Sequence, residues 1–248
     1  MTDAHREDRA ASFERGAGAY HAARPGYPAD VVRWIVPEGA RDVLDLAAGT
    51  GKLTAELVGL GLHVVAVEPS DAMRGELVRA LPGADARAGT ADATGLPDAS
   101  VDAVTVAQAW HWFDPATASA EAARVLRPHG QVAVLWNIRD DQTDWVGRWT
   151  EIVHRGDTLT TVYAEPALGS RFTAPEHATF RWAAPMRPAD LRTLAASRSH
   201  LLVLPDAERD QLLDAIDELV ATHPDLRGRD VIELPYRTEC WRARLVGR

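Results

Sequence analysis

The segment from Val43 to Glu68, VLDLAAGTGKLTAELVGLGLHVVAVE, restricts the fold more than any other part of the chain. Its two ends, 43–47 and 63–68, are short and almost continuously apolar, which is typical of parallel strands buried on both faces. Between them, a Gly-Thr-Gly turn leads into 52–60, where apolar residues recur at helical spacing. Strand, turn, helix and strand form a βαβ unit, so the sequence predicts a parallel sheet with helices packed on it.

The same alternation continues beyond this unit. Asp71 can cap a helix over 71–80, and Asp114 can cap another that has Pro115 at its first position. Repeated βα units with short links cross over in the right-handed sense and cover both faces of the sheet. The prediction is therefore an α/β fold with a doubly wound, mostly parallel seven-stranded sheet. Beyond the first two, its strands are expected at 84–89, 101–108, 130–136, 178–186 and within 231–246.

The pattern changes after the fifth predicted strand, because residues 138–175 show no clear strand periodicity. Before the first strand, the segment RPGYP favours a turn or an ordered arm. We therefore expect a single domain over 1–248 with a core at 41–137. Its two additions are an N-terminal arm or lid at 1–40 and an inserted cap, the substrate region, at 138–175 and 187–225.

Composition limits the function classes. The 248 residues carry a formal net charge of -9, which argues against general binding to a phosphate backbone. Cys240 is the single cysteine, so neither an intramolecular disulfide nor a thiolate metal cluster is expected. No apolar run reaches the ~18 residues of a membrane-spanning helix, and residues 1–12 lack an apolar signal core. The expectation is a cytoplasmic protein without a nucleic-acid or membrane partner.

Three features of the first βαβ unit favour a nucleotide-like cofactor. Gly49 and Gly51 follow the first strand, where a residue without Cβ lets a ligand approach the backbone and the helix N-terminus attracts an anionic group. Asp45 precedes this turn, and Glu68 ends the second strand, where a carboxylate can accept from both ribose hydroxyls. Thr54 stands where a dinucleotide fingerprint has its last glycine, and its side chain would hinder the close helix–strand contact of an NAD site.

Five motifs in order resemble those of class I S-adenosylmethionine (SAM)-dependent methyltransferases: VLDLAAGTGKLT, VAVEPSDAM, GTADATGLPDASVDAV, AQAWHWF and RVLRPHGQVAVLWN. The resemblance covers nearly the whole chain. It is greatest to the small-molecule branch that includes the ubiquinone/menaquinone C-methyltransferases and the trans-aconitate methyltransferases. It implies a Rossmann-like fold whose core at 41–137 binds SAM. It also implies methyl transfer to a small-molecule acceptor by in-line displacement, driven mainly by positioning.

The resemblance further implies which residues bind SAM. Asp45 would orient the turn or accept from the cofactor's amino group, and Glu68 would bind the ribose 2′- and 3′-hydroxyls. Thr90 stands where the family often has an Asp that accepts from the adenine amine, so Thr90 or the neighbouring Asp92 would take that role. The other cofactor contacts would come from Gly49 and Gly51, from Pro69, Met73 and Ala91 beside adenine, from Gln108 at the methionine end, and from Tyr20 and Arg24 of the arm.

His111, in AQAWHWF, has two interpretations. It could be the catalytic general base that removes a proton from the acceptor. Alternatively it packs and hydrogen-bonds so as to shape the loop, which is the interpretation we favour. An ionised carboxylate acceptor needs no base, whereas a phenol does. The residues assigned to the acceptor are Tyr27, Trp110, Trp112, Asn137, Arg139, Ser199, His200 and Tyr236, each with a plain structural role as its alternative.

Other functions remain as alternatives at this point. An NAD(P)-dependent oxidoreductase would share the sheet, but Thr54 and the lack of a distinct catalytic Tyr-Lys or His-Asp pair count against it. A SAM-binding protein without turnover would keep the same first motif. A nucleic-acid methyltransferase is not favoured by the charge or by any NPPY-like or paired-Cys motif. No metal is expected. The acceptor, the choice among O-, N- and C-methylation and the oligomeric state stay open.

Overall fold

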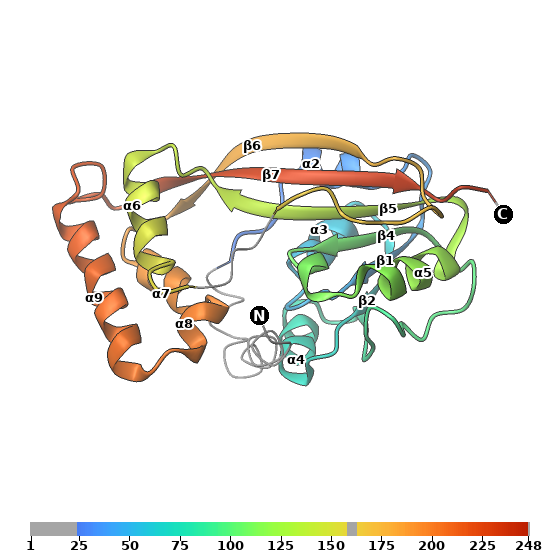
Figure 1. The fold of residues 1–248 in the computed structure, drawn as a ribbon, viewed down its shortest axis with the longest axis horizontal. Helices are drawn as coiled ribbons and strands as arrows, with labels where there is room; N and C mark the ends of the chain where they lie inside the picture. The colour runs from blue at the N-terminus through green and yellow to red at the C-terminus, as the bar shows by residue number, and fades with distance from the viewer. Residues whose placement is uncertain (1–23, 158–162, 248) are drawn as a thin grey trace. The chain divides into compact units, whose positions relative to one another are not determined.

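The computed structural model of the chain describes residues 24–157 and 163–247, which include a seven-stranded sheet (Figure 1). The strand order is β3-β2-β1-β4-β5-β7-β6. β1 is parallel to β2 and β4, β2 is parallel to β3, and β4 is parallel to β5. The strands are β1 (Asp42–Leu46), β2 (His63–Val67), β3 (Asp85–Arg87), β4 (Val101–Ala107), β5 (Leu126–Arg139), β6 (Glu176–Met186) and β7 (Ile232–Arg244). The predicted doubly wound, mostly parallel sheet is confirmed.

Helices connect the strands and follow them. They are α2 (Ala29–Ile35), α3 (Lys52–Gly59), α4 (Asp71–Ala80), α5 (Pro115–Val125), α6 (Asp144–Val153), α7 (Asp190–Ala196), α8 (Ser199–Val203) and α9 (Asp206–Thr222), with a 3-10 turn η1 at Trp110–Trp112. α5 begins as predicted, because the Asp114 carboxylate accepts from the Thr117 N–H and Pro115 is the first helical residue. The cap predicted for α4 was wrong. Ser70, and not Asp71, accepts from the Met73 N–H.

Two elements differ from the sequence prediction for identifiable reasons. β5 begins at Leu126 and not at 130, because its pairing with β4 shifts register between Val101 and Ala103. The residues LRPHG before that shift do not look like a strand. α2 lies inside the predicted arm, and its seven residues are too few for a reliable helical pattern.

The chain divides into two compact units, which are described separately. Unit 1 comprises Met1–Pro25, Ile138–Thr161 and Arg181–Arg237, and unit 2 comprises Gly26–Asn137, Val162–Phe180 and Thr238–Arg248. α6 to α9 belong to unit 1, whereas α2 to α5 and the strands β1 to β4 belong to unit 2. The single-domain organisation with an arm and a cap stays a prediction.

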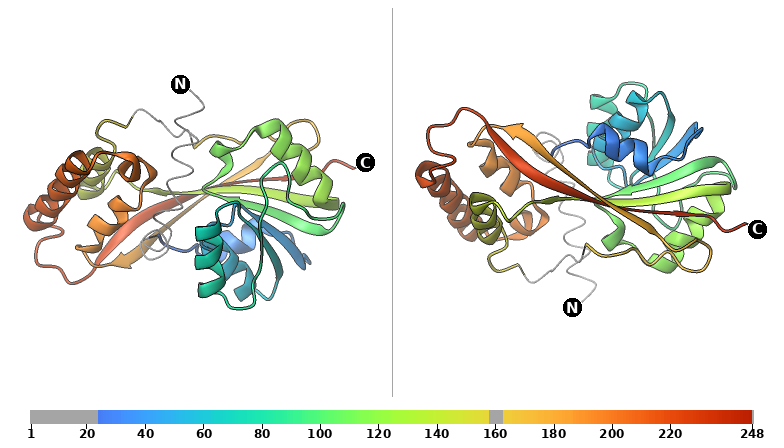
Figure 2. Two further views of the ribbon diagram at one scale, coloured as in Figure 1. Left: turned by 90° about the horizontal axis from the view of Figure 1, so that it is seen from below. Right: turned by 90° about the horizontal axis from the view of Figure 1, so that it is seen from above.

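In unit 2, α2 and α3 pack on one face of the sheet, and α5 lies on the opposite face (Figure 2). α2 contributes Val31 and Ile35 to a buried cluster, α3 contributes Leu53 and Leu57, and Val43 of β1 packs against them. Because the strands are parallel and in register, the loops that follow β1, β2 and β4 meet at one edge of the sheet, its carboxyl edge.

Unit 1 has its own apolar core. Trp145 and Trp149 lie one turn apart on α6 and are both buried, together with Leu194 of α7 and Ile216 of α9. The indole N–H of Trp149 donates to the carbonyl of Leu191 at 3.3 Å. These contacts account for the lack of strand periodicity at 144–153, because that segment is a helix packed against α7 and α9.

Candidate functional site

The carboxyl edge of unit 2 contains two non-glycine residues with left-handed backbones. Ala47 follows β1 with a φ of 55°, and Gln108 follows β4 with a φ of 62°. Main-chain hydrogen bonds hold both, from the Ala48 N–H to Val67 at 3.1 Å and from the Gln108 N–H to Leu135 at 2.9 Å. Such conformations cost about 1–3 kcal/mol and concentrate at functional sites. Ala99 and His129, near the amino ends of β4 and β5, also have a positive φ, so the carboxyl edge is taken as the candidate site because ligands of open α/β sheets bind at the carboxyl ends of the strands.

Asp45 is buried beneath the glycine turn, with only 1% of its surface exposed. Its carboxylate accepts from the Thr54 hydroxyl of α3 at 2.7 Å and from the Thr105 hydroxyl of β4 at 3.3 Å. Burial raises the pKa of Asp45 from its ordinary 3.8 to about 7, and the nearby Glu68 carboxylate adds to this effect. These contacts join α3 to the sheet, which supports the turn-orienting role. A direct contact with a cofactor stays a prediction.

Glu68 links the loops that follow β1 and β2. One carboxylate oxygen accepts from the Gly49 N–H at 2.9 Å, and the other accepts from the Ser70 N–H at 3.0 Å. Arg74 of α4 donates to the main-chain carbonyls of Glu68 at 2.6 Å and of Pro69 at 2.8 Å. Because a carboxylate offers about four lone-pair sites, Glu68 can fix both loops and still accept from ligand hydroxyls.

The glycine turn leaves room for a ligand against the main chain. A Cβ on Gly49 would have no atom of the described residues within 4 Å, whereas a Cβ on Gly51 would lie 2.8 Å from Cγ of Leu77. Between the glycines, the Thr50 hydroxyl is buried and has no hydrogen-bond partner in the described part of the chain. Open space, a buried hydroxyl and the Glu68 carboxylate fit the ribose and amino-acid parts of SAM, which carry hydroxyl and ammonium donors.

Alanine at the two glycines should separate ligand binding from folding. Gly51→Ala combines a φ of 83° with the clash against Leu77, so its free energy of unfolding should fall by about 1–3 kcal/mol. Gly49→Ala also places alanine at a positive φ of 57°, but its Cβ meets no atom of the described residues, so it should lose less stability and more SAM affinity. Urea unfolding and titration calorimetry with SAM measure the two effects. Unchanged SAM affinity in Gly49→Ala would contradict ligand contact at this turn.

The residues assigned to adenine lie in unit 2 at different depths. Met73 of α4 is buried, and Pro69 is exposed. Thr90 and Asp92 are exposed, and Ala91 is half-buried between them. Neither candidate for the adenine amine is therefore buried, and the choice between Thr90 and Asp92 stays open.

The loop that carries these three residues is anchored at its far end. Glu121 of α5 accepts from the Thr94 N–H at 2.8 Å and from the Thr94 hydroxyl at 2.6 Å. Arg124 pairs with the same carboxylate at 2.7 Å. Hydrogen bonds from Arg124 and Thr94 lower the pKa of Glu121 to about 2, so the anchor is ionised at neutral pH.

Gln108 and Asn137, which the sequence assigned to different ligands, contact each other. The Gln108 side-chain amide donates to the main-chain carbonyl of Asn137 at 3.2 Å. The Asn137 side chain donates to the carbonyl of Gly26 at 3.1 Å and accepts from the Thr238 hydroxyl at 2.7 Å. Both side chains thus support the local fold, and their ligand contacts stay predictions.

The turn η1 follows β4 and carries three predicted residues. Trp110 is buried and meets Phe113 edge-on, with ring centroids 5.8 Å apart. His111 and Trp112 are half-buried, and their ring centroids are 4.7 Å apart. The indole N–H of Trp136 donates to Nδ1 of His111 at 3.4 Å. Trp136 was not predicted, although its position at the end of the fifth predicted strand, next to Asn137, was a usable signal.

The N-terminal candidates are only partly described. Tyr20 lies outside the described residues. Arg24 is half-buried in unit 1, and Tyr27 is buried in the core of unit 2 with α2 and α3. The buried position of Tyr27 supports a structural role for its side chain. Its contact with the acceptor stays a prediction.

Two arginines of unit 1 contact residues of α6 or its C-terminal end. The Arg139 guanidinium lies over the Trp149 ring, 4.4 Å from its centroid. A nitrogen of Arg198 lies 3.0 Å from Nε2 of His154. Burial, Arg198 and Arg139 together lower the pKa of His154 from 6.5 to about 4, so this imidazole is neutral at pH 7.

Three more predicted residues lie in unit 1. Tyr236 is buried and stacks on Trp182, with ring centroids 4.9 Å apart. Burial raises the pKa of Tyr236, and the charges of Arg139, Arg24 and Arg198 oppose that rise. His200 is buried, with Nε2 at 3.2 Å from the carbonyl of Arg155. Ser199 is the first residue of α8.

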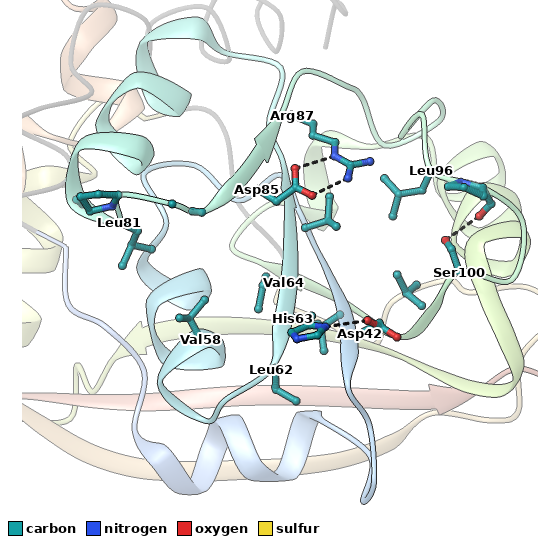
Figure 3. A pocket seen from close by; sticks show the side chains of 18 residues that line it. Asp42, Val58, Leu62, His63, Val64, Leu81, Asp85, Arg87, Leu96 and Ser100 are labelled. Carbon is teal, nitrogen blue, oxygen red and sulfur yellow. Dashed lines mark hydrogen bonds and ion pairs between the residues drawn. The ribbon is translucent and has the colours of Figure 1, made fainter.

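A pocket of about 730 Å³ in unit 2 contains none of the predicted residues (Figure 3). It is lined by Asp42 at the start of β1, by His63 and Val64 at the start of β2, and by residues around Leu81 and Leu96. These positions are at the amino ends of the strands. Ligands of open α/β sheets bind at the carboxyl ends, so the candidate site is the other edge.

Within residues 24–157 and 163–247, no group of three or more His, Cys, Asp or Glu could hold a metal ion. No helix of that part of the chain combines the length and apolar character needed to cross a membrane. Cys240 is buried, and burial raises the pKa of its thiol to about 12.

Comparison with known proteins gives a consistent assignment. A family described as "Methyltransferase domain" matches residues 44–134. An uncharacterized methyltransferase of Mycobacterium tuberculosis is 46% identical over 242 residues, which cover 97% of this chain and 98% of the relative. An uncharacterized methyltransferase-like protein of Schizosaccharomyces pombe is 34% identical over 237 residues, 92% of this chain and 93% of the relative. A demethylmenaquinone methyltransferase of Clavibacter sepedonicus is 40% identical over 106 residues, 41% and 43% of the two chains.

Solved structures share the fold. A candidate type II methyltransferase from Anaeromyxobacter dehalogenans superposes with a TM-score of 0.65 at 26% identity, covering 91% of this chain and 99% of its own. A SAM-dependent methyltransferase from Thermotoga maritima superposes with a TM-score of 0.52 at 18% identity, covering 95% and 99% of the two chains. At that identity the second likeness concerns the fold alone.

Proposed function

Because the chain belongs to the methyltransferase family, we propose that it transfers a methyl group from S-adenosylmethionine to a small-molecule acceptor. The observation that carries the cofactor assignment is the position of Glu68. Its buried carboxylate, directly after β2, accepts a hydrogen bond from the Gly49 N–H of the glycine turn. A group that can accept from ribose hydroxyls therefore lies beside the open main chain at Gly49. Family membership sets aside the oxidoreductase alternative.

In this proposal the protein acts by binding and orientation. SAM supplies an electrophilic methyl group on its sulfonium. Glu68 would accept from the ribose hydroxyls, and the main chain at Gly49 and Gly51 would lie against the ribose and methionine. Gln108, held by the carbonyl of Asn137, would contact the methionine end. Holding a nucleophile and a methyl group in line removes much of the barrier without a covalent intermediate.

For the acceptor, we propose a small molecule that carries a negative charge. Arg139, whose guanidinium lies over the Trp149 ring in unit 1, is proposed to bind this charge, because guanidinium groups bind carboxylates and phosphates through charge-assisted hydrogen bonds. An ionised carboxylate would also be a nucleophile that needs no base. The residues proposed for the acceptor are Tyr27, Trp110, Trp112, Asn137, Arg139, Ser199, His200 and Tyr236.

Two measurements test this function. Titration calorimetry with SAM and, separately, NADH should show binding of SAM alone. A radiolabelled-SAM screen of carboxylates, phenols, amines and activated carbons should then find label in a carboxylate-bearing compound, and its uncharged amide should be a poorer acceptor. If SAM binds but no acceptor class receives the label, the protein binds SAM without turnover. The absence of SAM binding would refute the proposal.

A further inference from the structure

We infer that Asp45 holds a proton when no cofactor is bound and releases it when SAM binds, so that the site increasingly favours SAM over the product S-adenosylhomocysteine as the pH rises. The part that concerns SAM rests on the proposed function. The part that concerns the proton rests on the surroundings of Asp45 in unit 2.

The hydrogen bonds of Asp45 support a neutral acid better than a carboxylate. The side chain is buried, and a carboxylate has about four lone-pair sites that need donors there. The Thr54 hydroxyl donates to Oδ2 at 2.7 Å, and the Thr54 N–H contributes less. The Thr105 hydroxyl lies 3.3 Å from Oδ1 and also 3.3 Å from the carbonyl oxygen of Leu44, so its single proton is shared between two acceptors. A proton on Oδ1 ends this competition, because Asp45 then donates to Thr105 and Thr105 donates to Leu44.

The charges around Asp45 act in the same direction. Among the described residues, the charged group that acts on Asp45 is the Glu68 carboxylate, which opposes its ionisation. Helix α3 faces Asp45 with Thr54, whereas its charged side chains, Lys52 and Glu56, act on each other. The other titratable side chains of β1, β2 and β4 lie at the amino ends of these strands: Asp42, His63 and Asp102. Burial, with a smaller contribution from Glu68, therefore raises the pKa of Asp45 to about 7.

A cation brought to the glycine turn changes this balance. Glu68 accepts from the Gly49 N–H of the turn, so Asp45, which senses the charge on Glu68, also senses a charge placed beside the turn. SAM carries a sulfonium cation. The product has a neutral sulfur and keeps the same ammonium and carboxylate groups, whose charges offset each other. A unit positive charge within about 10 Å, at an effective dielectric constant of about 20, lowers the pKa of a carboxyl group by about 1.

The direction of the pH dependence follows from this lowering. At about pH 8, Asp45 is already ionised before SAM binds, and the sulfonium gains the full attraction of its charge. At about pH 6, SAM binding must first displace the proton to the solvent, so SAM binds more weakly. If the sulfonium lowers the pKa of Asp45 by about 1, the ratio of SAM affinity to product affinity rises about 5-fold from about pH 6 to about pH 8. Asp45 is thus a specificity-determining residue of the cofactor site.

Infrared spectroscopy tests the proton without any ligand. The wild-type minus Asp45→Asn difference spectrum should contain the carbonyl band of a protonated carboxylic acid at about pH 6 and lose it at about pH 8. Glu76→Gln, which replaces a carboxylate of α4 paired with Arg79, is the matched control, and its difference spectrum should lack the band. Absence of the band from the Asp45→Asn difference spectrum at about pH 6 overturns the inference.

Titration calorimetry tests the link to SAM. At about pH 6.5, in two buffers of different ionisation enthalpy, SAM binding should release about half a proton more from wild-type and Glu76→Gln protein than from Asp45→Asn protein. Binding of S-adenosylhomocysteine should show no such difference. Equal proton release from wild-type and Asp45→Asn protein on SAM binding overturns the link. If neither protein binds SAM, the proposed function fails and the link fails with it, while the infrared band still decides the protonation of Asp45.

Discussion

Glu68→Ala is expected to weaken SAM binding by on the order of 10²-fold while the protein still folds. Hydrogen bonds to a charged group contribute about 1.5–3 kcal/mol each, and the two ribose bonds are not additive. The substitution also removes the acceptor for the Gly49 and Ser70 N–H groups, so part of the loss will come from the loops that Glu68 joins. Titration calorimetry with SAM measures the effect.

A matched control distinguishes the loss of the Glu68 contacts from the loss of one negative charge. Glu76→Ala removes the same charge from α4, where Glu76 pairs with Arg79 on the surface of the same helix. It should leave SAM affinity unchanged. Circular dichroism should show both variants folded. Equal affinity in folded Glu68→Ala and wild-type protein would refute the ribose role.

Asp45→Asn is expected to remove a pH-dependent loss of stability. Burial raises the pKa of Asp45 from 3.8 in an open environment to about 7 in the folded protein. The folded state therefore binds this proton more tightly than the unfolded state. At pH values below about 4 the carboxyl group is protonated in both states and does not lower the free energy of unfolding. As the pH rises from about 4 toward 7, the unfolded state ionises first, and the free energy of unfolding falls. At about 1.4 kcal/mol per pH unit the full cost is about 4 kcal/mol.

Asn keeps a carbonyl that can accept from Thr54 and Thr105, but it cannot ionise. The free energy of unfolding in urea, measured at about pH 5 and about pH 8, should therefore fall more for the wild-type protein than for Asp45→Asn. Asp92→Asn, on an exposed loop, is the control and should follow the wild-type slope. Parallel pH dependence in Asp45→Asn and wild type would show that Asp45 ionises freely in the fold.

The candidate site could be predicted in part because some signals are local in sequence. Gly49, Gly51 and Glu68 lie within one βαβ unit, and a parallel unit brings the ends of its strands together whatever surrounds it. The bond from the Gly49 N–H to Glu68 is the result. Asp114 as the cap of α5 is a similar case, because a cap depends on a few neighbouring residues.

Roles that depend on distant segments could not be predicted in the same way. Thr54 counted against an NAD site, but its hydroxyl serves to bond the buried Asp45. Asn137 and Tyr27, assigned to the acceptor, have partners from other parts of the fold.

The sequence by itself determined the α/β class and the mostly parallel sheet, and it predicted the edge proposed for the cofactor, since hydrophobic period and glycine turns act over a few residues. Only the tertiary structure decided the protonation of Asp45 and the hydrogen-bond partner of His111. Both depend on desolvation and on side chains that are remote in sequence: Thr105 is 60 residues from Asp45, and Trp136 is 25 residues from His111. Such contacts exist only once the sheet has brought separate strands side by side, and burial then gives them their energetic weight.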